Sequence, residues 1–281
     1  MCLFPIHASY ISLMCIFALF QQCYGNLCHE ENANVKVQGG SYLVEGDILC
    51  EDDKINKDHK VIEKGTHKWG PEMKYQIDGR FDDRAKTIIR DTLMNLETKV
   101  KKDALGCKFS LKEERPENQS QSIFFVKGDG YYTAVGKTAS SSSPHNISLA
   151  AIEKGKSGSI VHELMHAMGF WHEHVRPDRD KYITVNKRNI KKMKEIYFIR
   201  LNSNEVQGDF TDIKYDPCSL LHYGEYAFSN AKGKKTITSK QILPDGCEMG
   251  QRREATRSDI ERIRKMFKCE TKTGTGEKSG P

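Results

Sequence analysis

The sequence predicts an α+β fold, and three observations lead to that prediction. Apolar residues recur at helical spacing in two segments before residue 170 and again near residue 260. Short apolar runs beside glycines lie between the first two segments and predict strands. The stretch 184–245 contains several turn residues and little periodicity, so we expect it to be largely irregular.

The first helix is expected after one of two possible caps, Asp82 or Asp83, and should end near residue 102. Its apolar face consists of Ala85, Ile88, Ile89, Leu93 and Leu96. The run 123–126, bounded by Gly128 and Gly130, is expected to form a buried strand. Residues 131–135 and 147–152 are further strand candidates.

The second helix is expected to start from a cap at Ser157 or Ser159 and to stop at Gly169. Its apolar face consists of Ile160, Val161, Leu164, Met165 and Met168. Ser258 and Glu261 form a capping-box pattern, which predicts a last helix that runs to about residue 269. We expect the Gly- and Lys-rich tail, 271–281, to be disordered.

The N-terminus predicts a secreted protein. Residues 8–20 are almost wholly apolar and uncharged, too short to span a bilayer but typical of a signal peptide, which we place at 1–25. The alternative is a buried element of a cytosolic domain, but the polar stretch after it gives such an element nothing local to pack on. Residues 26–68 are polar and poorly periodic and are interpreted as a pro-segment or linker.

Charge and cysteine content narrow the class of protein further. The net charge of +6 is mild, and acidic residues sit among the spread-out Lys and Arg, so a nucleic-acid partner is not expected. Three of the nine cysteines lie in the signal peptide, which leaves six, an even number consistent with disulfides. Two sequons, at Asn118 and Asn146, suit the secretory route.

The motif His162-Glu163-Leu164-Met165-His166 is HExxH on the second expected helix. Histidines four residues apart lie on the same side of a helix, and Gly169 can turn the chain sharply so that His172 joins them. Three histidines with one open position form a catalytic rather than a structural zinc geometry. A chance pair of core or surface histidines would explain HExxH alone, but roughly one sequence in ten thousand would also carry Gly169 and His172 by chance.

This geometry predicts hydrolysis by one zinc ion per domain. Zinc lowers the pKa of a bound water and polarises the carbonyl under attack. Glu163 would take the proton of the water as general base and deliver it to the leaving amine. The oxyanion produced by the attack needs a further hydrogen-bond donor nearby.

The extended motif from His162 to Asp180 resembles the signature of the astacin family of metzincin zinc endopeptidases. The resemblance runs from about Trp69 to Cys269 and implies a metzincin catalytic domain of two subdomains flanking a cleft. It implies a twisted mixed sheet with two long helices in the N-terminal subdomain, and a mostly irregular C-terminal subdomain that ends in a helix. The residues that continue the signature are expected to support the site: His174, Arg176, Asp178, Arg179 and Asp180.

The resemblance implies roles for three residues near the site. The segment 219–223 resembles the family's Met-turn, in which Tyr223 would ligate zinc at rest and stabilise the transition state; a merely packed tyrosine is the alternative. Leu221 replaces the family's methionine, and their similar volumes should preserve the packing. Glu173 matches the acid that receives the mature N-terminus.

Cysteines depart partly from the family pattern. Cys107 and Cys269 match a family disulfide, whereas the partners of the second family disulfide, near Tyr131 and Lys154, are both missing. Cys218 and Cys247 are left over, and we expect them to form a non-standard pair.

Two further residues are assigned from the resemblance. Asp47, in Val44-Glu45-Gly46-Asp47, matches the propeptide aspartate that binds zinc and keeps the zymogen inactive, although a lone Gly-Asp is also an ordinary turn signal. Arg252 resembles a residue near the primed specificity pocket, where it would bind acidic substrate side chains; a solvated surface arginine is the alternative.

The sequence therefore predicts a signal peptide (1–25), a propeptide (26–60), an astacin-like catalytic domain (61–270) and a disordered tail (271–281). We expect a secreted, monomeric zymogen that cleaves proteins or peptides, needs an activating protease and makes no stable membrane contact. A catalytically weak, secreted zinc-binding module is the alternative that Leu221 and the altered cysteines favour. A cytosolic metalloprotein is disfavoured by the signal peptide and the sequons.

Overall fold

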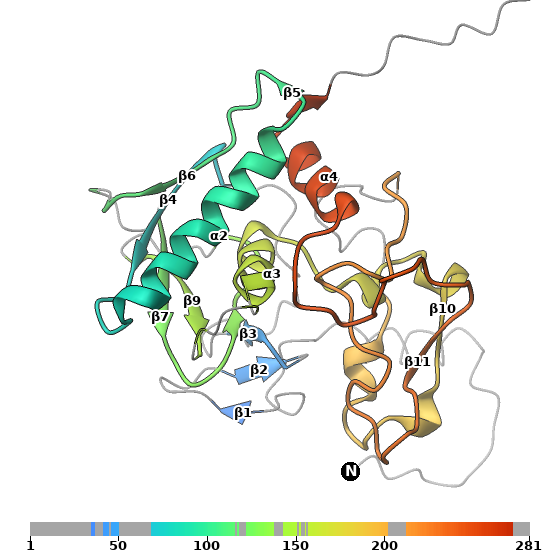
Figure 1. The fold of residues 1–281 in the computed structure, drawn as a ribbon. Helices are drawn as coiled ribbons and strands as arrows, with labels where there is room; N and C mark the ends of the chain where they lie inside the picture. The colour runs from blue at the N-terminus through green and yellow to red at the C-terminus, as the bar shows by residue number, and fades with distance from the viewer. Residues whose placement is uncertain are drawn as a thin grey trace, which may run out of the picture.

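The computed structural model contains one mixed sheet, three α-helices and a long irregular region among the residues it describes (Figure 1). The structure describes residues 35–36, 42–44, 46–50, 69–115, 117, 122–137, 143–150, 152, 155, 157–201 and 212–271. The predicted signal peptide, the tail after residue 271 and Asn118 lie outside these residues. No helix in the described part is long and apolar enough to cross a bilayer.

Regular elements are concentrated before residue 169. The strands there are β1 (Val35–Lys36), β2 (Tyr42–Val44), β3 (Ile48–Cys50), β4 (Glu72–Ile77), β5 (Ala104–Leu105), β6 (Ser110–Glu113), β7 (Ser122–Lys127), β8 (Tyr132–Thr133) and β9 (His145–Leu149). The helices there are α2 (Asp83–Lys101) and α3 (Ser157–Met168). We call residues 35–168 the N-terminal subdomain.

Residues 169–271 form the C-terminal subdomain, which is mostly irregular, as the sequence predicts. Its short 3-10 helices are η4 (Glu173–Val175), η5 (Arg179–Lys181), η6 (Lys187–Asn189) and η7 (Glu195–Phe198). Its strands are β10 (Ile183–Val185), β11 (Ile237–Ser239) and β12 (Glu270–Thr271), and its α-helix is α4 (Arg257–Met266).

Eight strands form the main sheet in the order β1-β2-β3-β8-β9-β7-β4-β6. Neighbours from β9 to β6 are parallel, whereas β8 runs antiparallel to β9 and the β1–β3 meander is antiparallel within itself. The strand β3 pairs in parallel with β8 through Ile48 and Thr133. The segment 26–68, interpreted from sequence as a poorly periodic pro-segment or linker, therefore contributes three strands to the sheet.

The first core lies between the sheet and the helices, and we call it the sheet core. In Figure 1, α2 crosses the sheet diagonally and α3 lies beside it, nearer the centre of the molecule. The buried side of α2 consists of Ala85, Ile89, Leu93, Leu96 and Val100. These pack with apolar residues of β4, β7, β9, α3 and α4. The α+β prediction is thus confirmed.

The second core, which we call the aromatic core, lies within the C-terminal subdomain. Its rings come from irregular segments, and its buried members are Ile48, Val135, Ile183, Ile190, Tyr197, Phe198, Tyr215, Tyr223, Ile237 and Met249. Ile48 and Val135 belong to the N-terminal subdomain. Because Ile48 lies on β3, its packing in this core connects the β2–β3 segment to the C-terminal subdomain.

The ends of α2 and the stop of α3 at Gly169 match the sequence prediction, but the predicted cap of α3 is wrong, because Ser157 and Ser159 both lie inside the helix. Asp82 caps α2, because its side chain accepts a hydrogen bond from Ala85 N at 2.7 Å. The predicted cap of α4 at Ser258 is wrong: Thr256 is the cap, and its capping box is completed by Asp259. Thr256 occupies the extended conformation that a cap requires, whereas Ser258 already lies inside the helix.

Candidate metal centre

Three buried histidines meet at the end of α3. His162 and His166 lie one turn apart on the helix, and their side chains are 1% and 0% exposed. Gly169 then takes φ = +114°, a left-handed conformation that ends the helix. Gly169 N donates to His166 O and Phe170 N donates to Met165 O, the two bonds of a Schellman motif. The turned chain brings His172, also 0% exposed, back to the other two.

Backbone carbonyls fix the orientation of two of these rings. His162 Nδ1 lies 2.7 Å from Leu220 O, and His166 Nδ1 lies 2.7 Å from Phe170 O. A carbonyl oxygen can only accept, so each Nδ1 carries the proton and each Nε2 carries a lone pair. Burial lowers the pKa of His162 to about 4, which keeps its ring neutral. Both imidazoles are therefore in the form that binds metal.

The lone pairs converge on one point. His162 Nε2 and His166 Nε2 lie 3.0 Å apart, with no proton between them to make a hydrogen bond. Asp47 Oδ2 lies 3.0 Å from His162 Nε2 and 3.3 Å from His172 Nε2. The four ligand atoms of this cluster lie within 4.8 Å of one another. Nitrogen and carboxylate donors in this number fit a zinc ion.

Asp47 reaches the histidines from the turn between β2 and β3. Gly46 precedes it with φ = +94°, and a Cβ at this position would meet the Phe228 ring at 3.3 Å. The carbonyl of Asp47 accepts from Thr133 N at 3.0 Å, so the turn is tied to β8. Glycine therefore permits both the turn and its close approach to the C-terminal subdomain.

Glu163 is 1% exposed and lies beside the cluster. Its Oε2 has no hydrogen-bond partner among the described residues. Burial raises the pKa of Glu163 well above its usual value, the charge of Asp47 raises it further, and Arg252 opposes both. A carboxylate in this setting has high proton affinity, as a general base requires.

Arg252 lies close to the site. It is half-buried, and its guanidinium donates to the backbone carbonyls of His222 and Gln251 at 3.3 and 3.0 Å. It is close enough to Asp47 and Glu163 for their charges to affect its pKa, which burial lowers. Its role in substrate specificity stays a prediction.

Tyr223 lies beside the third histidine. Its ring centroid is 4.7 Å from that of His172 and 3.8 Å from that of His174, on which it stacks at 23°. Leu221 is 1% exposed and belongs to the sheet core, so it fills the buried place expected for the family's methionine. Their ligand and packing roles remain predictions.

A buried polar network under the site was not expected from sequence. Asp259, at the start of α4, accepts from Leu220 N at 3.0 Å and from Ser219 Oγ at 2.6 Å. Leu220 in turn supplies the carbonyl that orients His162. The pattern Thr256-x-x-Asp259 could have revealed the cap, but its second use, beneath the metal cluster, depends on tertiary contacts.

Glu173 belongs to the same network. Its Oε1 accepts from Arg262 Nη2 at 2.6 Å, from Arg176 Nη1 at 3.2 Å and from Asp216 N at 2.8 Å. Burial raises its pKa, and the two arginines oppose that effect. Its predicted role as acceptor of a mature N-terminus stays a prediction.

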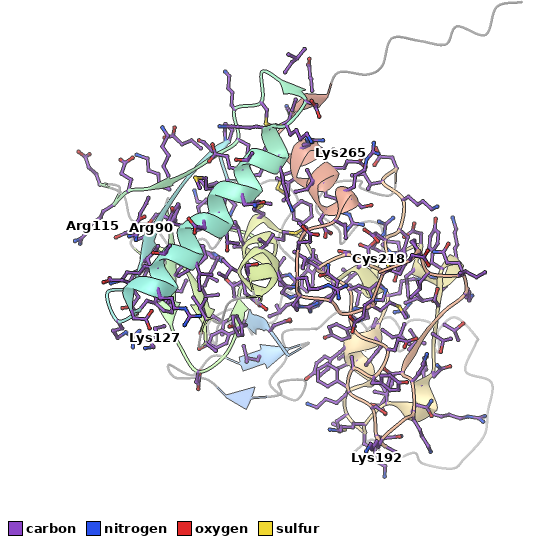
Figure 2. The ribbon with its side chains drawn as sticks, viewed as in Figure 1. Arg90, Arg115, Lys127, Lys192, Cys218 and Lys265 are labelled. Atoms are coloured by element: carbon purple, nitrogen blue, oxygen red, sulfur yellow. A yellow bond between two sulfur atoms is a disulfide. The ribbon has the colours of Figure 1, made fainter. Side chains whose placement is uncertain are left out.

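Disulfides join Cys107 to Cys269 and Cys218 to Cys247. The first connects the segment after α2 to the segment after α4, and the second ties the 240–250 loop to the start of the Met-turn-like segment. Figure 2 shows Cys218 in the middle of the C-terminal subdomain. Asn146, the sequon residue in the described part, lies exposed on β9.

Comparisons with known proteins agree with this site. A family model described as Astacin, a peptidase family, matches residues 61–268. Zinc metalloproteinase nas-4 of Caenorhabditis elegans is 33% identical over 238 residues, which cover 82% of this chain and 70% of that protein. Astacin-like metalloprotease toxin 1 of Loxosceles intermedia is 29% identical, over 89% of this chain and 92% of the toxin.

A solved structure shares the fold. The high choriolytic enzyme 1 of Oryzias latipes, a hatching enzyme zinc-protease, superposes with a TM-score of 0.56 at 28% identity, over 70% of this chain and 90% of that chain. Some relatives are longer: this chain spans 48% of the Mus musculus astacin-like metalloendopeptidase and 17% of the Drosophila melanogaster tolloid protein.

Proposed function

Because this chain belongs to the astacin family, we propose that it is a secreted zinc endopeptidase made as a latent precursor. One observation supports this more than any other. The Nε2 lone pairs of His162 and His166 face each other at 3.0 Å while both Nδ1 protons are committed to carbonyls. That arrangement is repulsive unless a cation lies between the rings, so His162, His166 and His172 are the proposed zinc ligands.

The chemistry follows from residues around the ligands. Bound zinc would polarise the scissile carbonyl and acidify a water molecule. Glu163 then takes the proton of the attacking water and passes it to the leaving amine. Tyr223, whose ring packs against the rings of His172 and His174, would donate a hydrogen bond from its phenol to the developing oxyanion. Arg252 attracts an acidic side chain on the leaving-group side of the substrate.

Latency would come from Asp47. Its carboxylate lies among the ligand nitrogens and would take a coordination position that the reaction needs. Removal of the propeptide by an activating protease would vacate that position, and the new N-terminus would bind Glu173. The mature enzyme would act as an extracellular monomer on proteins or peptides, without membrane or nucleic-acid partners.

The first test uses activated protein and a generic protein substrate. We expect cleavage that a chelator abolishes and added zinc restores. Glu163→Gln should lower kcat by about 10²- to 10⁴-fold while the protein still binds zinc, because only the base is lost. A protein that binds zinc but shows no cleavage after confirmed propeptide removal would instead be the secreted binding module.

The second test addresses latency. The full-length Asp47→Ala variant should cleave substrate without proteolytic processing, whereas Asp82→Ala, which removes an acid remote from the site, should stay latent. Unchanged latency of the Asp47→Ala protein would refute the inhibitory role.

A further inference from the structure

Two basic segments of the C-terminal subdomain lie side by side, although they are far apart in sequence. Asn230 N donates to Asn189 O at 2.8 Å, and Lys191 N donates to Phe228 O at 2.9 Å. The side-chain amides of Asn186 and Asn189 both donate to Lys235 O, at 3.1 and 2.8 Å. These bonds join the segment 186–191 to the segment 228–235 as one rigid unit.

This unit displays six exposed cations, which we call the basic surface: Lys187, Arg188, Lys191, Lys192, Lys232 and Lys234. Among the described residues, none of the six forms an ion pair. The nearby acids Glu225 and Asp180 pair with other cations, Lys235 and Arg200. Residues 226–240 contain no acid, and Glu195 is the one acid in 184–201. The sequence analysis expected acidic residues among the Lys and Arg throughout the chain, but this surface carries positive charges alone.

The basic surface includes a concave part and lies away from the metal centre. Residues 185–189 line a hollow of about 390 Å³, so Lys187 and Arg188 belong to the wall of a concavity. In Figure 2, Lys192 lies at the end of the C-terminal subdomain that is farthest from α2 and α4. Neither segment supplies a residue of the metal centre. A ligand bound here would leave the catalytic residues untouched.

We propose that the basic surface binds a sulfated polysaccharide and thereby holds the protein on an extracellular matrix. A flexible polyanion gains affinity from release of its counterions when several fixed cations meet it at once. The choice of a polysaccharide rests on the secretion stated in the proposed function, since sulfated chains are the polyanions met outside the cell.

Other polyanions fit the surface less well. Single-stranded nucleic acid needs aromatic faces on which bases stack, and the one exposed aromatic among residues 226–240, Tyr226, has the Lys235 ammonium over its ring at 6.0 Å. An anionic membrane needs apolar side chains that insert beside the cations, and Met193 is the one large apolar residue of 186–195 that is strongly exposed.

The test measures binding of the full chain to immobilised heparin as a function of salt. A variant with Lys187, Arg188, Lys191 and Lys192 changed to Gln should bind about tenfold more weakly at physiological salt, with a salt dependence reduced by about one unit of slope per lost contact. The matched control changes four exposed cations of the N-terminal subdomain to Gln, namely Arg84, Lys102, Lys108 and Arg115. It has the same net charge and should bind within about twofold of wild type.

Three results would overturn the proposal: equal loss in the control, unchanged binding of the quadruple variant, or tighter binding to DNA or to phosphatidylserine vesicles than to heparin. Adding Lys232→Gln and Lys234→Gln to the quadruple variant tests whether both segments form one surface. Heparin binding should then be weaker than in the quadruple variant. Thermal unfolding shows that each variant is folded, and neither readout depends on peptidase activity.

Discussion

The two cores of the protein are built on different principles. The sheet core joins aliphatic faces of helices and strands whose backbones satisfy their own hydrogen bonds. The C-terminal subdomain around the aromatic core contains few such elements, and particular side chains satisfy its backbone, as Asn189 does for Lys235 and Asp259 for Leu220. The metal centre takes His162 and His166 from α3 of the N-terminal subdomain, and their orientation from the carbonyls of Phe170 and Leu220 in the C-terminal subdomain. Single polar residues should therefore matter most in the C-terminal subdomain.

The largest effect is expected at Asp259. In Asp259→Asn the amide nitrogen cannot accept from Leu220 N, and the buried Arg262 loses a counter-charge, so the free energy of unfolding should fall by about 3 to 5 kcal/mol. Because Leu220 O orients His162, zinc affinity should also fall about tenfold, measured by chelator competition. Asp82→Ala is the control: it removes the α2 cap and should lower the free energy of unfolding by about 1 kcal/mol without changing zinc affinity.

In the sheet core, Leu93→Ala should lower the free energy of unfolding by about 3 kcal/mol, because a fully buried side chain leaves a cavity. Zinc affinity should stay the same, since no hydrogen bond to a ligand changes. Denaturant titration and chelator competition together check this. A parallel loss of zinc affinity would show that the two regions are less separate than their hydrogen bonds indicate.

Tyr223→Phe removes one hydroxyl from the aromatic core and keeps the ring stacked on His174. We expect kcat to fall about 10²-fold, as for loss of an oxyanion donor, with KM and the thermal midpoint nearly unchanged. Steady-state kinetics of the activated enzyme measure this. If kcat matched wild type, Tyr223 would be a packed ring with no part in the reaction.

The smallest effect is expected at Leu221, where the sheet core meets the C-terminal subdomain. Leu221→Met conserves volume, so the free energy of unfolding should change by less than about 1 kcal/mol and kcat/KM by less than about twofold. A rise of tenfold or more in kcat/KM would show instead that leucine at this position weakens the enzyme.

The same contrast separates what could be predicted from what could not. Helical spacing located α2 and α3 and placed His162 and His166 on one side of α3, and Gly169 predicted the turn that brings His172 to them, because those relations are local. The strands β1–β3 were missed because each has two or three residues and because they join the rest of the sheet through the pairing of β3 with distant β8. The Asp259 network and the basic surface escaped prediction because each joins segments that only the tertiary fold brings together.

The pairing of β3 with β8 has a consequence for activation. Cleavage near residue 60 would remove β1, β2 and β3 from the sheet order, and β8 would pass from an interior strand to an edge. Thr133 N, which donates to the Asp47 carbonyl, would then be available to another acceptor. An extended peptide can add to such an edge as a new strand. Activation would then be a change of sheet topology, in which the cut that frees the metal centre also opens a place for substrate backbone.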